Sequence, residues 1–153
     1  MQKQSSRGFT FVEIIIVVMI MTILSTIGLS TYASVQVRSR DTKRKTDVEL
    51  VRSALEQYRS NNDAYPTGSG SYGLPFGSGD LSDGGGNTYM DPIPDDPRSG
   101  SRHYSYTSTD GSDYEIKVDL ERAQPTPCAL PTVVDECGTG FNCNFCYNSL
   151  GQQ

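Results

Sequence analysis

The sequence predicts an α+β fold, in which one long N-terminal helix packs on a small antiparallel sheet and a Cys-rich loop follows at the C-terminus. Three observations support this prediction. A stretch without proline runs from Phe9 up to Pro66 and begins with the apolar run Phe9–Leu29. Two segments within residues 102–122 alternate polar and apolar side chains, as half-buried strands do. All four cysteines lie in residues 123–153.

The composition limits the classes of function that the chain can serve. Its 153 residues suffice for one small domain, and one histidine disfavours a His-rich metal site and any catalytic device that needs two histidines. A formal net charge of −5 disfavours nucleic-acid binding by the whole molecule, so DNA is not an expected partner. Gly84–Gly86 follows no predicted strand and precedes no predicted helix, so it is not a phosphate-binding loop. No catalytic arrangement stands out, which predicts a protein that is not an enzyme and needs no cofactor.

The apolar run Phe9–Leu29 has 21 residues and one charge, Glu13. As a helix it would be ~31 Å long, which matches the hydrocarbon core of a bilayer. The polar segment 1–8 before it carries Lys3 and Arg7, which favour a cytoplasmic N-terminus. More basic residues follow the run than precede it, so charge counting alone leaves the orientation open.

Three interpretations of this N-terminal segment compete. An ordinary secretory signal would be cleaved near Thr31–Ala33, and a plain signal anchor would be retained. Neither explains the Gly8–Phe9 border or the acid inside the apolar run. A carboxylate in that position costs a few kcal/mol or more to bury, so Glu13 is expected to be functional and to have a partner.

The segment Arg7–Glu13, RGFTFVE, followed by Ile, Val, Met and Leu residues, resembles the prepilin cleavage and methylation motif. Type IV pilins and the pseudopilins of type II secretion carry this motif. The resemblance implies cleavage between Gly8 and Phe9 by a membrane-embedded prepilin peptidase, followed by N-methylation of Phe9. It departs from the family pattern at Phe11, where leucine is more common, and in having no proline within the apolar helix.

The resemblance also implies how such a chain is used. The subunit would be held in the inner membrane by a single pass, with its N-terminus in the cytoplasm. A membrane platform protein and a cytoplasmic assembly ATPase would then polymerise it into a helical homo-oligomer, an extracellular or periplasmic filament. Glu13 would be the assembly residue. Cleavage creates an amine on Phe9, and the Glu13 carboxylate of one subunit would neutralise the Phe9 amine of a neighbour in the apolar filament core.

The helix is predicted to extend from Phe9 to about Arg59, which is ~77 Å at 1.5 Å per residue. Its first half, 9–29, is the membrane-spanning and filament-core part, and residues 30–60 are amphipathic. Asn61–Asp63 and the following Pro66 indicate where it stops. The apolar stripe expected to pack on the sheet consists of Val48, Val51, Ala54, Leu55 and Tyr58.

A basic cluster lies in the amphipathic part of this helix. Its members are Arg38, Arg40, Lys43, Arg44 and Lys45. We interpret the cluster as a solvated helix face, including contacts between subunits, because Asp41, Asp47 and Glu49 are interspersed as partners. The alternative is contact with DNA or with anionic lipid headgroups. No aromatic residues interleave the basic ones, which weakens the case for single-stranded nucleic acid.

Residues 61–101 are predicted to be a Gly- and Pro-rich loop, and residues 102–122 an antiparallel hairpin. Its strands are expected at 103–107 and 114–120, with a turn at Thr109–Ser112. His103 is expected to be a surface or packing residue. Three pieces are similar to major pseudopilins: Tyr65-Pro66, Ile93–Arg98 and Tyr104–Ile116.

Major pseudopilins often carry a calcium site near this hairpin. Asp110, Asp113 and Glu115 are the candidate oxygen ligands here. The family's downstream acid has no clear counterpart, since Lys117–Leu120 continues as strand. Solvated turn acids are therefore the favoured interpretation, and no metal site is predicted.

The tail 123–153 contains Cys128, Cys137, Cys143 and Cys146. An even number of cysteines outside the cytoplasm indicates two disulfides. Three pairings are possible, of which the nested Cys128–Cys146 with Cys137–Cys143 is a guess, and a four-Cys zinc site is the alternative. The tail has little apolar material, so cross-links are expected to be what orders it.

Together these observations predict a structural subunit of a type IV pilus or of a type II secretion pseudopilus. The alternative is a membrane-anchored extracytoplasmic binding module with a disulfide-stabilised head. Such a module would keep its leader and stay monomeric.

Overall fold

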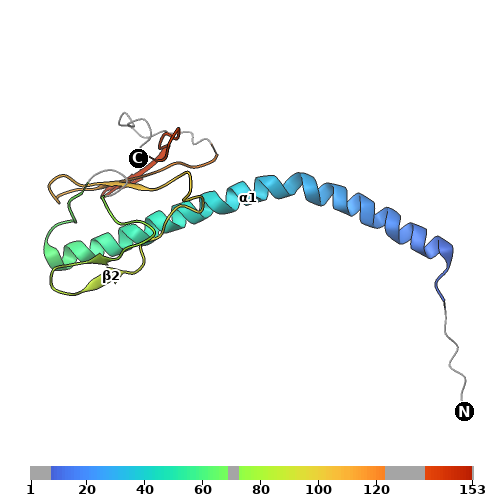
Figure 1. Cartoon of the computed structure of the whole chain (residues 1–153), viewed down its shortest axis with the longest axis horizontal. Helices are drawn as coiled ribbons and strands as arrows, with labels where there is room; N and C mark the ends of the chain where they lie inside the picture. The colour runs from blue at the N-terminus through green and yellow to red at the C-terminus, as the bar shows by residue number, and fades with distance from the viewer. Residues whose placement is uncertain (1–7, 69–72, 123–136, 153) are drawn as a thin grey trace, which may run out of the picture. The chain divides into compact units, whose positions relative to one another are not determined.

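A computed structural model of the chain describes residues 8–68, 73–122 and 137–152 (Figure 1). The chain divides into two compact units, Met1–Val37 and Arg38–Gln153, each of which is described by itself. The elements are α1 (Phe11–Asn62), β1 (Leu81–Ser82), β2 (Thr88–Met90), β3 (Ser105–Thr107), β4 (Glu115–Val118), β5 (Phe145–Asn148) and β6 (Gly151–Gln152).

Helix α1 has 52 residues and contains almost all of the predicted helix. It begins two residues later than expected because Thr10 caps it: the Glu13 N–H donates to Thr10 Oγ1 at 3.4 Å and to the Thr10 carbonyl at 3.1 Å. It ends at Asn62 because Asp63 adopts a left-handed conformation, with φ 59°. The Asp63 N–H then donates to the Arg59 carbonyl at 2.8 Å. The predicted stop at Asn61–Asp63 is confirmed.

The core of the second unit lies between the amphipathic part of α1 and a four-stranded antiparallel sheet of order β3-β4-β5-β6. The stripe on α1 is buried as predicted, with Tyr58 packed at its margin. The register pairs Tyr106 with Ile116 and Val118 with Phe145. The sheet side of the core consists of Tyr104, Tyr106, Tyr114, Ile116, Val118, Leu120 and Phe145.

The C-terminal tail contains a disulfide, as predicted, but it also contributes two strands where only loop was expected. Strand β5 pairs with β4 over four residues, and β6 pairs with β5. Two cations of α1 also lie over aromatic rings of β5: Lys45 Nζ is 5.1 Å from the Phe145 ring centre, and the Arg52 guanidinium is 5.1 Å from that of Tyr147. Backbone pairing and these cation–π contacts therefore hold the tail on the sheet and the helix.

The segment expected to be loop, 61–101, contains the two-stranded antiparallel sheet β1–β2. Its turn is organised by Asp83, whose carboxylate accepts the Gly85 N–H at 2.8 Å and the Tyr89 hydroxyl at 2.6 Å. Hydrogen bonds from Tyr89 and Asn87 hold the pKa of Asp83 well below its usual range. The glycine run Gly84–Gly86 therefore serves a tight turn between two strands, which a composition-based prediction of loop does not reveal.

A disulfide joins Cys137 to Cys143. Cys146 is also disulfide-bonded, and no described cysteine is free. The disulfide removes two of the four thiolates that a zinc site would need. Cys128 lies outside the described residues, so the Cys128–Cys146 pairing stays a prediction.

Candidate assembly and anchoring site

The segment that carries the cleavage motif is exposed. Gly8, Phe9 and Thr10 precede α1 and are not helical. The Phe9 side chain is 80% exposed, and a Cβ placed on Gly8 would meet no atom within 4 Å. Within the described residues, nothing from the chain itself therefore shields the peptide bond between Gly8 and Phe9.

Glu13 occupies the third position of the first helical turn. Its N–H donates to Thr10 Oγ1 at 3.4 Å, which is half of a capping box. A carboxylate in the first turn is also favoured by the helix dipole. Among the residues that the structure describes, no cation or hydrogen-bond donor contacts the Glu13 carboxylate. The acid is thus positioned by the helix start but has no partner within the described chain.

The apolar part of α1 presents its side chains outward on all sides. This helix is long and apolar enough to cross a membrane, and none of its most apolar 18-residue window is buried. Its hydroxyl groups donate to carbonyls of the preceding turn: Thr22 to Met19 at 2.7 Å and Ser25 to Met21 at 2.8 Å. Neither of these two hydroxyl groups therefore needs water as a hydrogen-bond acceptor. So large an apolar surface needs lipid or other helices around it.

In the second unit, Arg44 is the centre of a buried ion-pair cluster. Its side chain is 0% exposed. The guanidinium donates twice to Asp96, from Nε to Oδ2 at 2.7 Å and from Nη2 to Oδ1 at 3.0 Å. Nη1 donates to Asp41 Oδ1 at 2.8 Å and to Glu121 Oε1 at 3.1 Å. Burial disfavours the charged guanidinium, but these bonds outweigh it and raise the pKa of Arg44.

This cluster corrects the prediction that the basic segment is a solvated face. Arg38, Lys43 and Lys45 are exposed as expected, but Arg44 is buried and Arg40 is half-buried. Arg40 forms a bidentate pair with Glu121, with both N···O distances 2.6 Å. Arg44 and Arg40 are withdrawn from solvent because their partners come from elsewhere in the fold. Asp96 lies in the loop before β3 and Glu121 in the segment after β4, both far from α1 in sequence.

The cluster predicts an acid-sensitive stability of the second unit. The hydrogen bonds from Arg40 lower the pKa of Glu121 from 4.5 to about 2. Because the folded-state pKa is depressed, the stabilisation by this carboxylate is complete above pH 4.5 and is lost as the pH falls towards 2. We expect the melting temperature, measured by circular dichroism, to fall over this range more steeply in the natural protein than in Glu121→Gln. Equal slopes for the two proteins would contradict this role of Glu121.

The calcium candidates lie along one surface hollow but are engaged locally. Asp110 Oδ1 accepts from the Ser112 hydroxyl at 2.7 Å, and Asp113 Oδ1 accepts from the Tyr114 N–H at 2.7 Å. The third candidate, Glu115, pairs with Lys117 at 3.3 Å. In the part of the chain that the structure describes, no three His, Cys, Asp or Glu side chains converge to hold a metal ion. His103 is partly buried, and its backbone N–H donates to the Cys137 carbonyl at 3.1 Å.

Comparison of the sequence with known proteins places the chain in a family. The family model for the prokaryotic N-terminal methylation motif matches residues 3–29. The type II secretion system core protein G of Pseudomonas aeruginosa is 30% identical over 115 residues, which cover 72% of this chain and 81% of that protein. The chain belongs to the pilin and pseudopilin family. It is therefore a structural protein and not an enzyme, and its apolar helix and motif are those of a membrane-anchored subunit.

Other members of the pilin and pseudopilin family match shorter segments. Core protein G of Klebsiella michiganensis is 36% identical over 67 residues, and this match spans about half of that relative, 47% of its length. The type IV major pilin protein PilA of Myxococcus xanthus is 35% identical over 60 residues, or 39% of this chain and 27% of that protein. No solved structure matches the chain significantly.

Motif and structure differ in what they reveal of this site. The sequence predicted Gly8, Phe9 and Glu13 because they are neighbours in one local motif. It missed Asp96 and Glu121 as partners of Arg44, although Asp96 lies in the Ile93–Arg98 segment that resembles pseudopilins. The one available signal was an acid in a proline-bounded loop, which does not by itself identify a buried partner.

Proposed function

We propose that this chain is a filament subunit that a prepilin peptidase cleaves between Gly8 and Phe9. It is then N-methylated on Phe9, held in the inner membrane and polymerised. The observation that carries this proposal is the unpartnered Glu13 carboxylate, on a helix whose most apolar 18-residue window has no buried residue. Within the described chain, the carboxylate has no counter-charge and the apolar surface is not covered. Packing of such helices against one another would supply both.

Cleavage supplies the partner that Glu13 lacks. The new amine lies on Phe9, four residues before Glu13 and near the same side of the helix start. Packing two copies with an axial offset brings the carboxylate of one onto the amine of the other, and two buried charges are neutralised together. Because an unpaired charge in this apolar environment costs several kcal/mol, the pair sets the register of the subunits more than it adds stability.

The comparisons favour the secretion pseudopilus as the filament. The match to the Pseudomonas relative, a type II secretion protein, covers 72% of this chain, whereas the match to the pilin PilA covers 39% of it. The proposed partners are copies of this chain, the peptidase, a membrane platform protein and the assembly ATPase. The second units would coat the filament exterior.

Mass spectrometry of the mature chain tests this function. We expect a chain that begins at N-methylated Phe9. A chain that begins at Met1 or near Ser34 would contradict the proposal, because it would indicate the membrane-anchored monomeric module or a secretory signal instead.

Gly8→Val is expected to slow processing tenfold or more, since one extra methylene in a tight subsite costs about 1–3 kcal/mol and valine adds three carbons. The substitution fits the chain itself, because a Cβ on Gly8 meets nothing within 4 Å. The ratio of precursor to mature chain, measured by mass spectrometry of membranes, gives the effect. Membrane insertion and the near-ultraviolet circular dichroism of the second unit are expected to stay unchanged. Normal processing of this variant would contradict cleavage at Gly8.

A further inference from the structure

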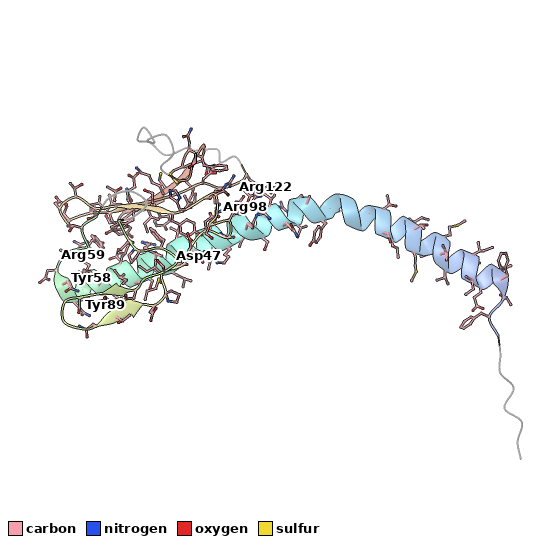
Figure 2. The ribbon with its side chains drawn as sticks, in the orientation of Figure 1. Asp47, Tyr58, Arg59, Tyr89, Arg98 and Arg122 are labelled. Atoms are coloured by element: carbon pink, nitrogen blue, oxygen red, sulfur yellow. A yellow bond between two sulfur atoms is a disulfide. The ribbon has the colours of Figure 1, made fainter. Side chains whose placement is uncertain are left out.

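A surface hollow of about 400 Å³ lies at the start of the second unit. We call it the basic hollow. It is lined by Arg38, Asp41, Thr42, Lys45 and Arg122. Four of these residues come from consecutive turns of α1, and Arg122 lies beside them in the segment after β4 (Figure 2).

The one acid in the basic hollow is already neutralised. Asp41 Oδ1 accepts from Arg44 Nη1 at 2.8 Å and from the Glu121 N–H at 2.9 Å. Its Oδ2 accepts from the Arg122 N–H at 3.0 Å. Both oxygens of the Asp41 carboxylate are therefore occupied by donors from Arg44 and from the backbone of residues 121–122. The charges that remain at the surface of the basic hollow are those of its arginine and lysine side chains.

The basic hollow carries side-chain donors of the kind that an oxyanion accepts. Lys45 is exposed but oriented, because its ammonium lies 5.1 Å from the centre of the Phe145 ring. Arg38 and the hydroxyl-bearing Thr42 are exposed on the preceding turn of α1. A guanidinium, an ammonium and a hydroxyl within one hollow match the donors that bind phosphate oxygens.

The basic hollow also begins where the apolar surface of α1 ends. Exposed apolar side chains continue beyond the most apolar part of the helix to Tyr32 and Val35, which are 63% and 53% exposed. Arg38 follows Val35 by three residues, ~4.5 Å along the helix. Tyrosine is characteristic of the membrane–water interface, and long basic side chains reach back to it. Along α1, Arg38 therefore lies closest to the level of lipid phosphates, and Lys45, ~15 Å beyond Val35, lies on the same side of the helix two turns further on.

We propose that the basic hollow binds the phosphodiester of an anionic phospholipid while the subunit is stored in the membrane. In the proposed orientation, with the N-terminus in the cytoplasm, cations on this side of the membrane run against the positive-inside tendency, and a lipid phosphate gives them a partner. The proposal rests on membrane anchoring and not on polymerisation. Lipid binding can therefore be disproved while the proposed filament function stands, and the filament function can be disproved while lipid binding stands.

The test is a titration of the full chain in neutral detergent with phosphatidylglycerol, read by native mass spectrometry. We expect one retained lipid per chain. Arg38→Gln and Lys45→Gln are each expected to weaken its binding about fivefold, and the double variant correspondingly more. Phosphatidylcholine is expected to show no such retention.

Lys43→Gln is the matched control, because it removes the same charge from the same helix two residues away and does not line the basic hollow. Its binding is expected to stay within twofold of the natural protein. Equal losses in Lys43→Gln and Lys45→Gln would overturn the site, since they would show diffuse attraction only. If Lys45→Gln alters the near-ultraviolet circular dichroism, Arg38→Gln alone decides.

Two further results would overturn the lipid assignment. One is inorganic phosphate bound by the full chain as tightly as phosphatidylglycerol. The other is a dimer in the native spectrum that Arg38→Gln/Lys45→Gln abolishes while leaving lipid retention unchanged, because the hollow would then serve an acidic surface of a second copy.

Discussion

Replacing Glu13 by alanine is expected to reduce filament yield at least tenfold while leaving a processed chain in the membrane. Without the carboxylate, each assembled Phe9 amine would be buried without a counter-charge, at a cost of about 3 kcal/mol or more per subunit. The measurement is the fraction of mature chain recovered in sheared filaments, together with electron microscopy. The processed N-terminus is checked by mass spectrometry.

Two control variants separate charge from helix capping. Glu13→Gln keeps the size of the side chain but removes its charge, so it is expected to behave like Glu13→Ala. Thr10→Ala removes the cap of α1 but keeps the acid. It is expected to retain most of the filament yield. Normal yield from Glu13→Ala, or equal losses in Glu13→Ala and Thr10→Ala, would contradict the assembly role of the carboxylate.

Asp96→Ala is expected to destabilise the second unit by ~3–5 kcal/mol, because it leaves a buried guanidinium without its bidentate partner. Arg44 is 0% exposed and Asp96 is 1% exposed at the side chain, so water cannot replace the lost carboxylate without opening the core. Urea unfolding of the full chain in neutral detergent, followed by tyrosine circular dichroism, measures the change in the free energy of unfolding.

The neighbouring acid provides a matched control. Asp95→Ala removes the same charge one residue away, where the carboxylate accepts a single hydrogen bond from the Asp96 N–H at 2.7 Å. We expect a loss of about 1 kcal/mol or less. If the two variants lost the same stability, loop geometry and not the buried ion pair would be responsible.

The parts of the fold that the sequence predicted depend on local patterns. The uninterrupted helix followed from the absence of proline and from the stripe that includes Val48 and Leu55, both of which are buried. The hairpin of β3 and β4 followed from alternation, although the strands are shorter than predicted. The helix stop followed from residues that tolerate a left-handed conformation, and Asp63 is the one that adopts it.

The parts that the sequence did not predict depend on residues far apart in the chain. Strand β5 has consecutive apolar residues, Phe145, Cys146 and Tyr147, so alternation gives no signal. It becomes a strand because β4 offers a free edge and α1 offers cations for its rings. Likewise, nothing local distinguishes Arg44 from its neighbours Lys43 and Lys45, because its burial requires two acids more than 50 positions away.

The candidate site shows the same division. Gly8, Phe9 and Glu13 lie within one short motif, and the sequence therefore identified them together. The partner of Glu13 is absent from any single described chain, because in the proposed mechanism it exists only after cleavage and between subunits. The sequence and the structure of one copy show that Glu13 has no partner within the described residues. The proposed partner, the Phe9 amine of a neighbouring subunit, can be observed only in the assembled filament.

The distance between the Phe9 amine of one subunit and the Glu13 carboxyl of another tests the central claim most directly. Solid-state NMR can measure this distance in filaments grown from a mixture of two kinds of chain. One kind is labelled with ¹⁵N at phenylalanine, and the other is labelled with ¹³C at the glutamate side-chain carboxyl. The ¹⁵N signal of the amine comes from Phe9 alone, because every other phenylalanine nitrogen is an amide. The account predicts intermolecular dephasing of that amine by a carboxyl carbon within about 5 Å, as in an ion pair. An amine with no labelled carboxyl carbon of a neighbouring chain near it, in intact filaments, would contradict the account.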